Sequence, residues 1–137
     1  MDKRLFFVIN KAQQKIFRHF GRRAEKHLGV SPVQIGALFF VDKNKGCLLK
    51  ELSSGLDLQN SAITGLVARM EKAGLLQRKT CTDDARATRI YLTKKASSIL
   101  ENAKPLLVAM NQDLSKGFSE AEMLVVLRFL NKLIERF

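Results

Sequence analysis

Apolar residues recur every three or four positions over residues 3–28, and this spacing predicts a long amphipathic helix. The stripe consists of Leu5, Ile9, Ala12, Ile16 and Phe20. Gly29 follows it and predicts the end of the helix.

A second helix is predicted from Ser31 to about Asp42. Ser31 at the cap, Pro32 at the first helical position and Gln34 at the third form a capping-box arrangement. Asn44 and Gly46 then favour a break in the chain.

Two helices separated by a tight turn follow. The first covers Leu49–Leu56 and is weakened by Gly55, whereas the second covers Gln59–Ala73 and ends at Gly74. Asp57 and Leu58 form the turn between them. The inward face of the longer helix is predicted from its apolar spacing to be Ile63, Leu66, Val67 and Met70.

Two strands, Leu76–Thr80 and Thr88–Leu92, are predicted next, joined by a polar tip at Cys81–Ala87. Cys47–Leu48 could pair with this hairpin as a small third strand. The order of short helix, turn, longer helix and hairpin predicts a winged helix-turn-helix within a mainly α chain that carries a small β-wing.

The last two helices are predicted from Lys94 to about Leu114, with Thr93 as cap, and from Ser119 to Phe137. Pro105 predicts a kink in the first, and Ser119 with Glu122 forms a capping box for the second. The final helix is apolar on most sides, which favours burial against a second subunit. A single well-buried C-terminal helix is the alternative.

The net charge of +11 is concentrated in two blocks. Residues 1–30 carry eight basic and two acidic side chains, and residues 69–95 carry eight and three, whereas the two kinds balance elsewhere. The second block covers the end of the long helix and the hairpin. It fits a surface that binds a phosphate backbone, although a solvated face is the simpler alternative.

The outer face of the Gln59–Ala73 helix supports the DNA-binding interpretation. It is small and polar at its start and basic at its end, with Asn60, Ser61, Thr64, Gly65, Ala68, Arg69 and Lys72. Small residues let a backbone approach base edges, and polar ones hydrogen-bond them. At the hairpin tip, Arg86 could enter a minor groove or simply pair with Asp84.

The sequence resembles the MarR family of transcriptional regulators over nearly its whole length. The matching pieces include Ser31-Pro32-x-Gln34, the run from Ile63-Thr64 through Gly74-Leu75-Leu76-x-Arg78, and Asp84-x-Arg86 followed by Leu92-Thr93. Their order and spacing carry the resemblance.

The resemblance implies a homodimer that binds a pseudo-palindromic site on double-stranded DNA. It implies more often a repressor than an activator, and relief by a small-molecule effector, aromatic or phenolic in type. Residues 1–30 and 105–137 would supply the dimerisation helices, and residues 31–104 the DNA-binding lobe.

Residue by residue, the resemblance places seven positions on the recognition helix: Gln59, Asn60, Ser61, Ala62, Thr64, Gly65 and Arg69. Arg86 takes the minor-groove position and Asp84 orients it, while Arg78, Lys79 and Arg89 contact phosphates. Gln59 stands where the family often has a Ser cap, so the start of the helix can shift. Ala85 replaces a common second Arg and weakens the hold of the wing.

Other functions are less well supported. The two histidines, His19 and His27, lie eight residues apart without the partners of a catalytic triad or a helical zinc site, so neither enzyme activity nor a metal or cofactor is expected. A winged helix that binds protein would carry an apolar or acidic recognition face.

A redox-sensing regulator is the remaining alternative, in which oxidation of Cys81 on the basic wing, or of Cys47, releases DNA. Both cysteines are better interpreted as bystanders. Phe20 and Phe40 are weak candidates for an effector crevice and favour core packing instead. The chain has neither a signal-peptide pattern nor a membrane-spanning run, so a cytoplasmic protein is expected.

Overall fold

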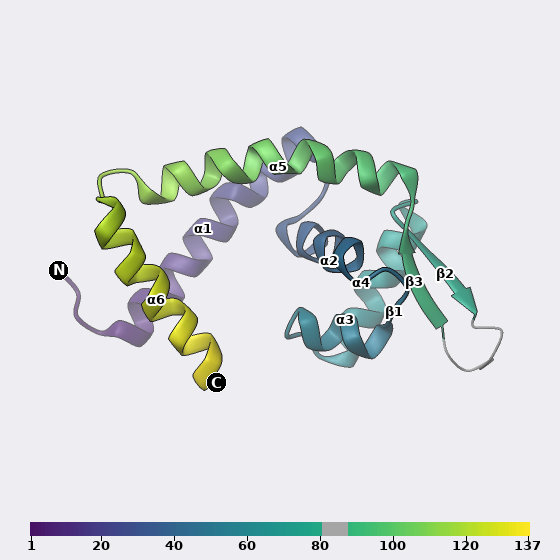
Figure 1. The fold of residues 1–137 in the computed structure, drawn as a ribbon, viewed down its shortest axis with the longest axis horizontal. Helices are drawn as coiled ribbons and strands as arrows, with labels where there is room; N and C mark the ends of the chain where they lie inside the picture. The colour runs from purple at the N-terminus through teal and green to yellow at the C-terminus, as the bar shows by residue number, and fades with distance from the viewer. Residues whose placement is uncertain (81–87) are drawn as a thin grey trace. The chain divides into compact units, whose positions relative to one another are not determined.

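The computed structural model describes residues 1–80 and 88–137 (Figure 1). The sequence predictions for Cys81, Asp84, Ala85 and Arg86 therefore lie outside the described residues. The described chain forms two compact units, Met1–Lys104 and Pro105–Phe137, and one helix runs through the division between them. The assignment of residues 1–30 and 105–137 to dimerisation stays a prediction.

Six helices and three strands make up the described chain. The elements are α1 (Leu5–Leu28), α2 (Pro32–Lys43), β1 (Cys47–Leu48), α3 (Leu49–Gly55), α4 (Asn60–Lys72), β2 (Leu76–Thr80), β3 (Thr88–Leu92), α5 (Lys94–Ser115) and α6 (Glu120–Arg136). This mainly helical chain with a small sheet is the predicted fold class.

Local capping explains where α1 ends and α2 begins. Gly29 adopts a left-handed conformation with φ of 70°, which a residue without a Cβ reaches at low cost, and it ends α1. The predicted capping box at Ser31 is confirmed, because its hydroxyl accepts from the Gln34 amide at 3.2 Å. The Gln34 side chain in turn accepts from the Ser31 amide at 3.0 Å.

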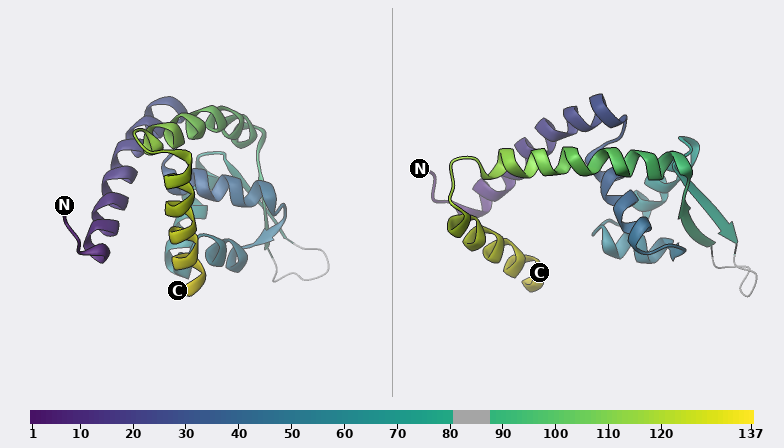
Figure 2. Two further views of the ribbon diagram at one scale, coloured as in Figure 1. Left: turned by 60° about the vertical axis from the view of Figure 1, so that its left-hand side comes forward. Right: turned by 45° about the horizontal axis from the view of Figure 1, so that its top comes forward.

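The three strands form one antiparallel sheet in the order β1-β3-β2. Cys47 pairs with Ile90, and Ile90 pairs with Arg78 on its other side. The small third strand is thus confirmed. Figure 2 shows the hairpin of β2 and β3 extending away from the helices of the first unit.

The core of the first unit is built on the predicted inward face of α4. Ile63, Val67 and Met70 are fully buried, and Leu66 is 4% exposed. The same core takes Leu38 from α2, Leu52 from α3, and Leu76 and Ile90 from the sheet. One apolar layer therefore fixes α4 against the sheet and the other two helices.

Gly55 has a different role from the one predicted. It is the last residue of α3, and a Cβ there would overlap the ring of Phe40 on α2. Its main effect is therefore to admit the Phe40 ring against α3, whereas the sequence suggested only a weakened helix.

The second unit contains the end of α5 and all of α6. The capping box of Ser119 and Glu122 is confirmed, with the Glu122 amide donating to the Ser119 hydroxyl at 3.1 Å. The α6 helix, which the structure describes in full, buries none of its residues within the chain. The choice between a second subunit and a single well-buried C-terminal helix stays a prediction.

Pro105 lies inside α5, where a kink stays a prediction. Within the described residues, none of the helices is both long and apolar enough to cross a membrane.

Candidate nucleic-acid interface

The outer face of α4 is a continuous exposed surface. The helix begins one residue later than predicted, because Gln59 is its N-cap and Ala73 its C-cap. Its outward residues are exposed, apart from a half-buried Gly65: Asn60, Ser61, Ala62, Thr64, Gly65, Ala68, Arg69 and Lys72. The structure thus brings together the predicted recognition residues of this helix, with Gln59 exposed just before them.

The start of α4 is held by a residue that the sequence analysis did not single out. Ser53 on α3 is 7% exposed, and its hydroxyl donates to the Leu58 carbonyl at 2.6 Å. Its backbone carbonyl accepts from the Leu58 amide at 3.1 Å. Asp57 completes this turn with a positive φ of 51°, a conformation that Asp tolerates better than most residues. In the sequence, the position of Ser53 directly after the inward-facing Leu52 was the available indication that its side chain is buried.

The end of α4 is held by the segment that follows the sheet. The Thr93 hydroxyl donates to the Gly74 carbonyl at 2.6 Å, and the Lys95 ammonium donates to the Ala73 carbonyl at 2.9 Å. Positive charge at a helix C-terminus is also favourable because of the helix dipole. Thr93 additionally caps α5 as predicted, accepting from the Ala96 amide at 3.1 Å. Both ends of α4 are therefore fixed by hydrogen bonds from neighbouring elements.

Two contacts shape the exposed face of α4 itself. The Thr64 hydroxyl donates to the Asn60 carbonyl at 2.8 Å, so its proton is used inside the helix while the side chain stays exposed. At Gly65, an added Cβ would lie 3.1 Å from Arg69 Nη1. The Arg69 side chain thus lies along the helix over Gly65.

Each predicted phosphate-binding residue of the strands already contacts a neighbour. Arg78 Nε lies 3.3 Å from a Glu71 carboxylate oxygen on α4, and Lys79 Nζ lies 4.9 Å from the centre of the Tyr91 ring. Arg89 donates to the Gly46 carbonyl at 2.9 Å. Exposed pairs of this kind add under about 1 kcal/mol of stability, so their main effect is to orient the cations.

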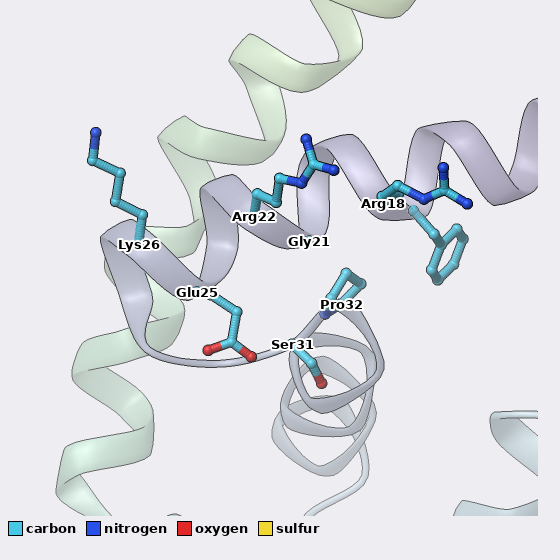
Figure 3. Close-up of a pocket in the computed structure, with 8 residues that line it drawn as sticks. Arg18, Gly21, Arg22, Glu25, Lys26, Ser31 and Pro32 are labelled. Carbon is cyan, nitrogen blue, oxygen red and sulfur yellow. The ribbon is translucent and has the colours of Figure 1, made fainter.

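A separate open pocket lies between α1 and the start of α2, with a volume of about 680 Å³. Figure 3 shows Pro32 facing α1 near Gly21, with Arg22 and Lys26 extending away from α2. Three cations, Arg18, Arg22 and Lys26, border it, together with Phe17, Gly21, Glu25, Ser31 and Pro32.

Phe20 and Phe40, the weak candidates for an effector crevice, do not border this pocket, and their packing is the role that the sequence favoured. Phe20 is 4% exposed and lies in the core. The ring of His19 packs edge-on against it, with 5.0 Å between the ring centroids. Phe40 is half-buried and packs where Gly55 lacks a side chain. The aromatic side chain at the α1 pocket is instead Phe17, which is 47% exposed.

Cys47 is poorly suited to sensing oxidants. It is 4% exposed, and burial, followed by the nearby Glu51 carboxylate, raises the pKa of its thiol. A raised pKa lowers the fraction of thiolate, which is the reactive form. Over residues 1–80 and 88–137, there is also no cluster of three or more His, Cys, Asp or Glu side chains that could hold a metal ion.

Comparisons with known proteins agree with this geometry. The MarR family model matches residues 28–87, which span α2 to the hairpin. A transcriptional regulatory protein proposed for the hcr operon of Thauera aromatica is 28% identical over 133 residues, covering 97% of this chain and 80% of that protein.

Two solved structures share the fold. The transcriptional repressor CouR, bound to a 23-mer DNA duplex, has a TM-score of 0.87 at 23% identity, covering 95% of this chain and 92% of that one. BpsR of Bordetella bronchiseptica, whose DNA binding is regulated by 6-hydroxynicotinic acid, has a TM-score of 0.86 at 18% identity, covering 96% and 98%. With its winged helix-turn-helix and its exposed polar and basic α4 face, the chain is similar to the MarR family of DNA-binding transcriptional regulators, whose family model matches residues 28–87.

Proposed function

We propose that this regulator is a homodimer that binds a pseudo-palindromic operator in double-stranded DNA and represses transcription until a small molecule releases it. The observation that carries the proposal is the division of α4 into a buried apolar face and an exposed polar and basic face. The apolar face of α4 is already buried within its own unit, so its outer face is available to bind another molecule.

In this proposal the outer face of α4 enters the major groove. Gln59, Asn60 and Ser61 lie at its start, where recognition helices meet base edges. The methyl of the exposed Thr64 could contact a thymine methyl, while Arg69 is the candidate for a guanine. Ala62 and Gly65 are small, so the DNA can approach the helix backbone closely at these positions. Lys72 adds positive charge near the phosphates.

The wing supplies affinity in this proposal. Arg78, Lys79 and Arg89 contact phosphates, and each is oriented by its own neighbour, Glu71, Tyr91 or Gly46. At the hairpin tip, Arg86 reaches a minor groove and Asp84 orients it, as the resemblance implies.

The exposed apolar face of α6 supports a dimer. Leu127, Leu130 and Ile134 follow helical spacing and are 50%, 40% and 75% exposed. Single exposed apolar residues are common on monomers, but a whole exposed stripe usually marks an interface. A second copy of the chain is the proposed cover, and two copies would present two α4 helices about one helical turn of DNA apart.

The proposal of repression and of release by a small molecule is supported by similar proteins and by the pocket beside α1. CouR is a repressor, and BpsR responds to 6-hydroxynicotinic acid, a hydroxylated aromatic acid. Arg18, Arg22 and Lys26 would favour the carboxylate of such a ligand, and Phe17 its ring. The ligand would lower DNA affinity by as much as it favours a non-binding conformation.

The test is selection of bound sequences from a random duplex pool at near-physiological salt, with wild type and Arg69→Ala in parallel. The proposal expects an inverted repeat for wild type and a changed base preference at one position for the variant. Binding without sequence preference, or the same preferred site for both proteins, would contradict it.

A further inference from the structure

Ser53 is the one buried polar side chain among the described residues, and it lies beside the first residue of the recognition helix. Its oxygen is 2.6 Å from the Leu58 carbonyl oxygen and 3.3 Å from Asn60 Oδ1. Ser53 therefore connects α3, the turn and α4. Because it is shielded from water, its hydrogen bonds must come from the protein.

The chemistry of the Ser53 hydroxyl, the Leu58 carbonyl and the Asn60 carboxamide determines which group donates each hydrogen bond. A serine hydroxyl carries one proton and two lone pairs. The carbonyl of Leu58 has no proton to give and is the nearer acceptor, so it receives the Ser53 proton. What remains at the serine oxygen toward Asn60 is a lone pair, and a lone pair calls for a donor.

Asn60 can supply that donor through its NH2 group. The oxygen and nitrogen of a carboxamide have nearly the same shape, and their assignment follows from the hydrogen bonds that each can make. With the amide turned so that its NH2 faces Ser53, all three groups are satisfied. The Ser53 hydroxyl donates to Leu58, and Asn60 donates to Ser53.

This orientation matters for reading DNA. In this orientation one N–H of Asn60 would bind Ser53, which would leave the amide oxygen and the second N–H of this exposed residue for another partner. An oxygen and an adjacent N–H are the pair that binds adenine N6–H and N7 in the major groove. We propose that Ser53 is a positioning residue that orients the Asn60 carboxamide for reading an adenine. This inference rests on the proposed function.

Preorganisation gives Ser53 a measurable role. An exposed asparagine that is free to rotate loses side-chain freedom when it pairs with a base, whereas one held by Ser53 has already lost it. Ser53 should therefore affect recognition at the base pair that Asn60 contacts and leave the other positions unchanged.

The experiment uses the full chain and the duplex obtained by selection. Ser53→Ala, Asn60→Ala and the double variant are measured against that duplex and against duplexes with each half-site base pair replaced in turn. Ser54→Ala is the matched control, because Ser54 is the exposed neighbour on the same helix. Urea unfolding of each variant gives its stability separately from its DNA affinity.

We expect Ser53→Ala and Asn60→Ala each to lose about tenfold in affinity for the selected duplex and to lose preference at the same A·T pair. The double variant should bind within about twofold of either single variant, because both substitutions remove one shared interaction. Ser54→Ala should stay within about twofold of wild type.

Two results would overturn the inference. One is a loss with Ser53→Ala that is equal for every duplex, which would mean a purely structural role. The other is an unchanged base preference in Asn60→Ala, a surface variant that should fold whatever Ser53→Ala does. A wild type without any sequence preference would instead contradict the proposed function.

A measurement on DNA-free wild type tests the orientation on its own. NMR should show a nuclear Overhauser effect between the Asn60 NH2 protons and the Ser53 β protons. If that signal is missing while those of the neighbouring core are present, the proposed amide orientation is wrong, whatever the DNA experiments show.

Discussion

The helices α4 and α6 are both amphipathic, but only α4 has its apolar face covered within its own unit. Ile63 and Met70 on α4 are fully buried, whereas Leu127 and Ile134 on α6 are 50% and 75% exposed. On α4 the exposed face is the polar and basic one; on α6 apolar residues are exposed as well.

This difference indicates which kind of surface the exposed groups of each helix would match. The uncovered groups of α4 are hydrogen-bonding and cationic, and they match base edges and phosphates. Those of α6 are hydrocarbon, and they match another apolar surface. The same chain therefore combines a nucleic-acid interface with a proposed protein interface.

The largest effect is expected where α4 is buried. Met70→Ala should lower the free energy of unfolding by about 2–5 kcal/mol, because it removes a fully buried side chain and leaves a cavity. Urea denaturation followed by circular dichroism measures it. The adjacent exposed Arg69→Ala should change stability by under about 0.5 kcal/mol, and equal losses in the two variants would contradict the assignment of the α4 faces.

The next effect concerns α6. Leu127→Asp should weaken dimerisation by about 100-fold, because a charge would be buried in the proposed interface. Sedimentation over a range of protein concentrations measures the change. Ala121→Asp adds the same charge at an exposed position on the opposite side of the same helix and is the control. Unchanged dimerisation in Leu127→Asp would place the interface elsewhere.

A smaller effect is expected on the outer face of α4. Arg69→Ala should cost about 1–3 kcal/mol of binding to the selected duplex and relax preference at one position. Fluorescence anisotropy with single-substitution duplexes measures both. A uniform loss across all duplexes would assign Arg69 to a phosphate instead.

A still smaller effect is expected from the wing. Lys79→Ala should weaken binding to all duplexes alike and reduce the log–log salt slope by about 2, since each of the two chains on a duplex loses one phosphate contact. Tyr91→Leu should lower affinity less, because it removes only the ring beneath the Lys79 ammonium. An unchanged salt slope in Lys79→Ala would exclude the phosphate contact.

The smallest effect is expected at Cys47. Because burial raises the pKa of its thiol, the thiolate is scarce at neutral pH, and it should increase only as the pH rises toward that raised pKa. Mass spectrometry should show slow labelling of Cys47 by a thiol reagent in the native protein. Rapid labelling, together with oxidant release of DNA that Cys47→Ala abolishes, would restore the redox alternative.

The sequence predicted those elements whose signals are local. The spacing of Ile63, Leu66, Val67 and Met70 identified the buried face of α4, and Ser31 and Ser119 identified two helix starts. The strands β2 and β3 match their predicted bounds, and β3 is the one rich in β-branched and aromatic residues.

The rest depends on contacts between elements distant in the chain. No local pattern indicates that Lys95 bonds to the end of α4, or that Gly55 makes room for Phe40 fifteen positions earlier. Ser53 could be noticed as the neighbour of Leu52 on a short helix, but its hydrogen-bond partners are evident only in the structure. The pocket beside α1 likewise could not be predicted, because it forms only where α1 meets the start of α2.

The most direct test of the account is the mass of the complex on the selected duplex, measured by native mass spectrometry for wild type and Leu127→Asp. Two wild-type chains are expected on each duplex, and for the variant mainly free DNA or a single bound chain at the same concentration. A single wild-type chain on each duplex, or two chains for both proteins, would contradict the pairing of one DNA-reading helix with one dimer-forming helix.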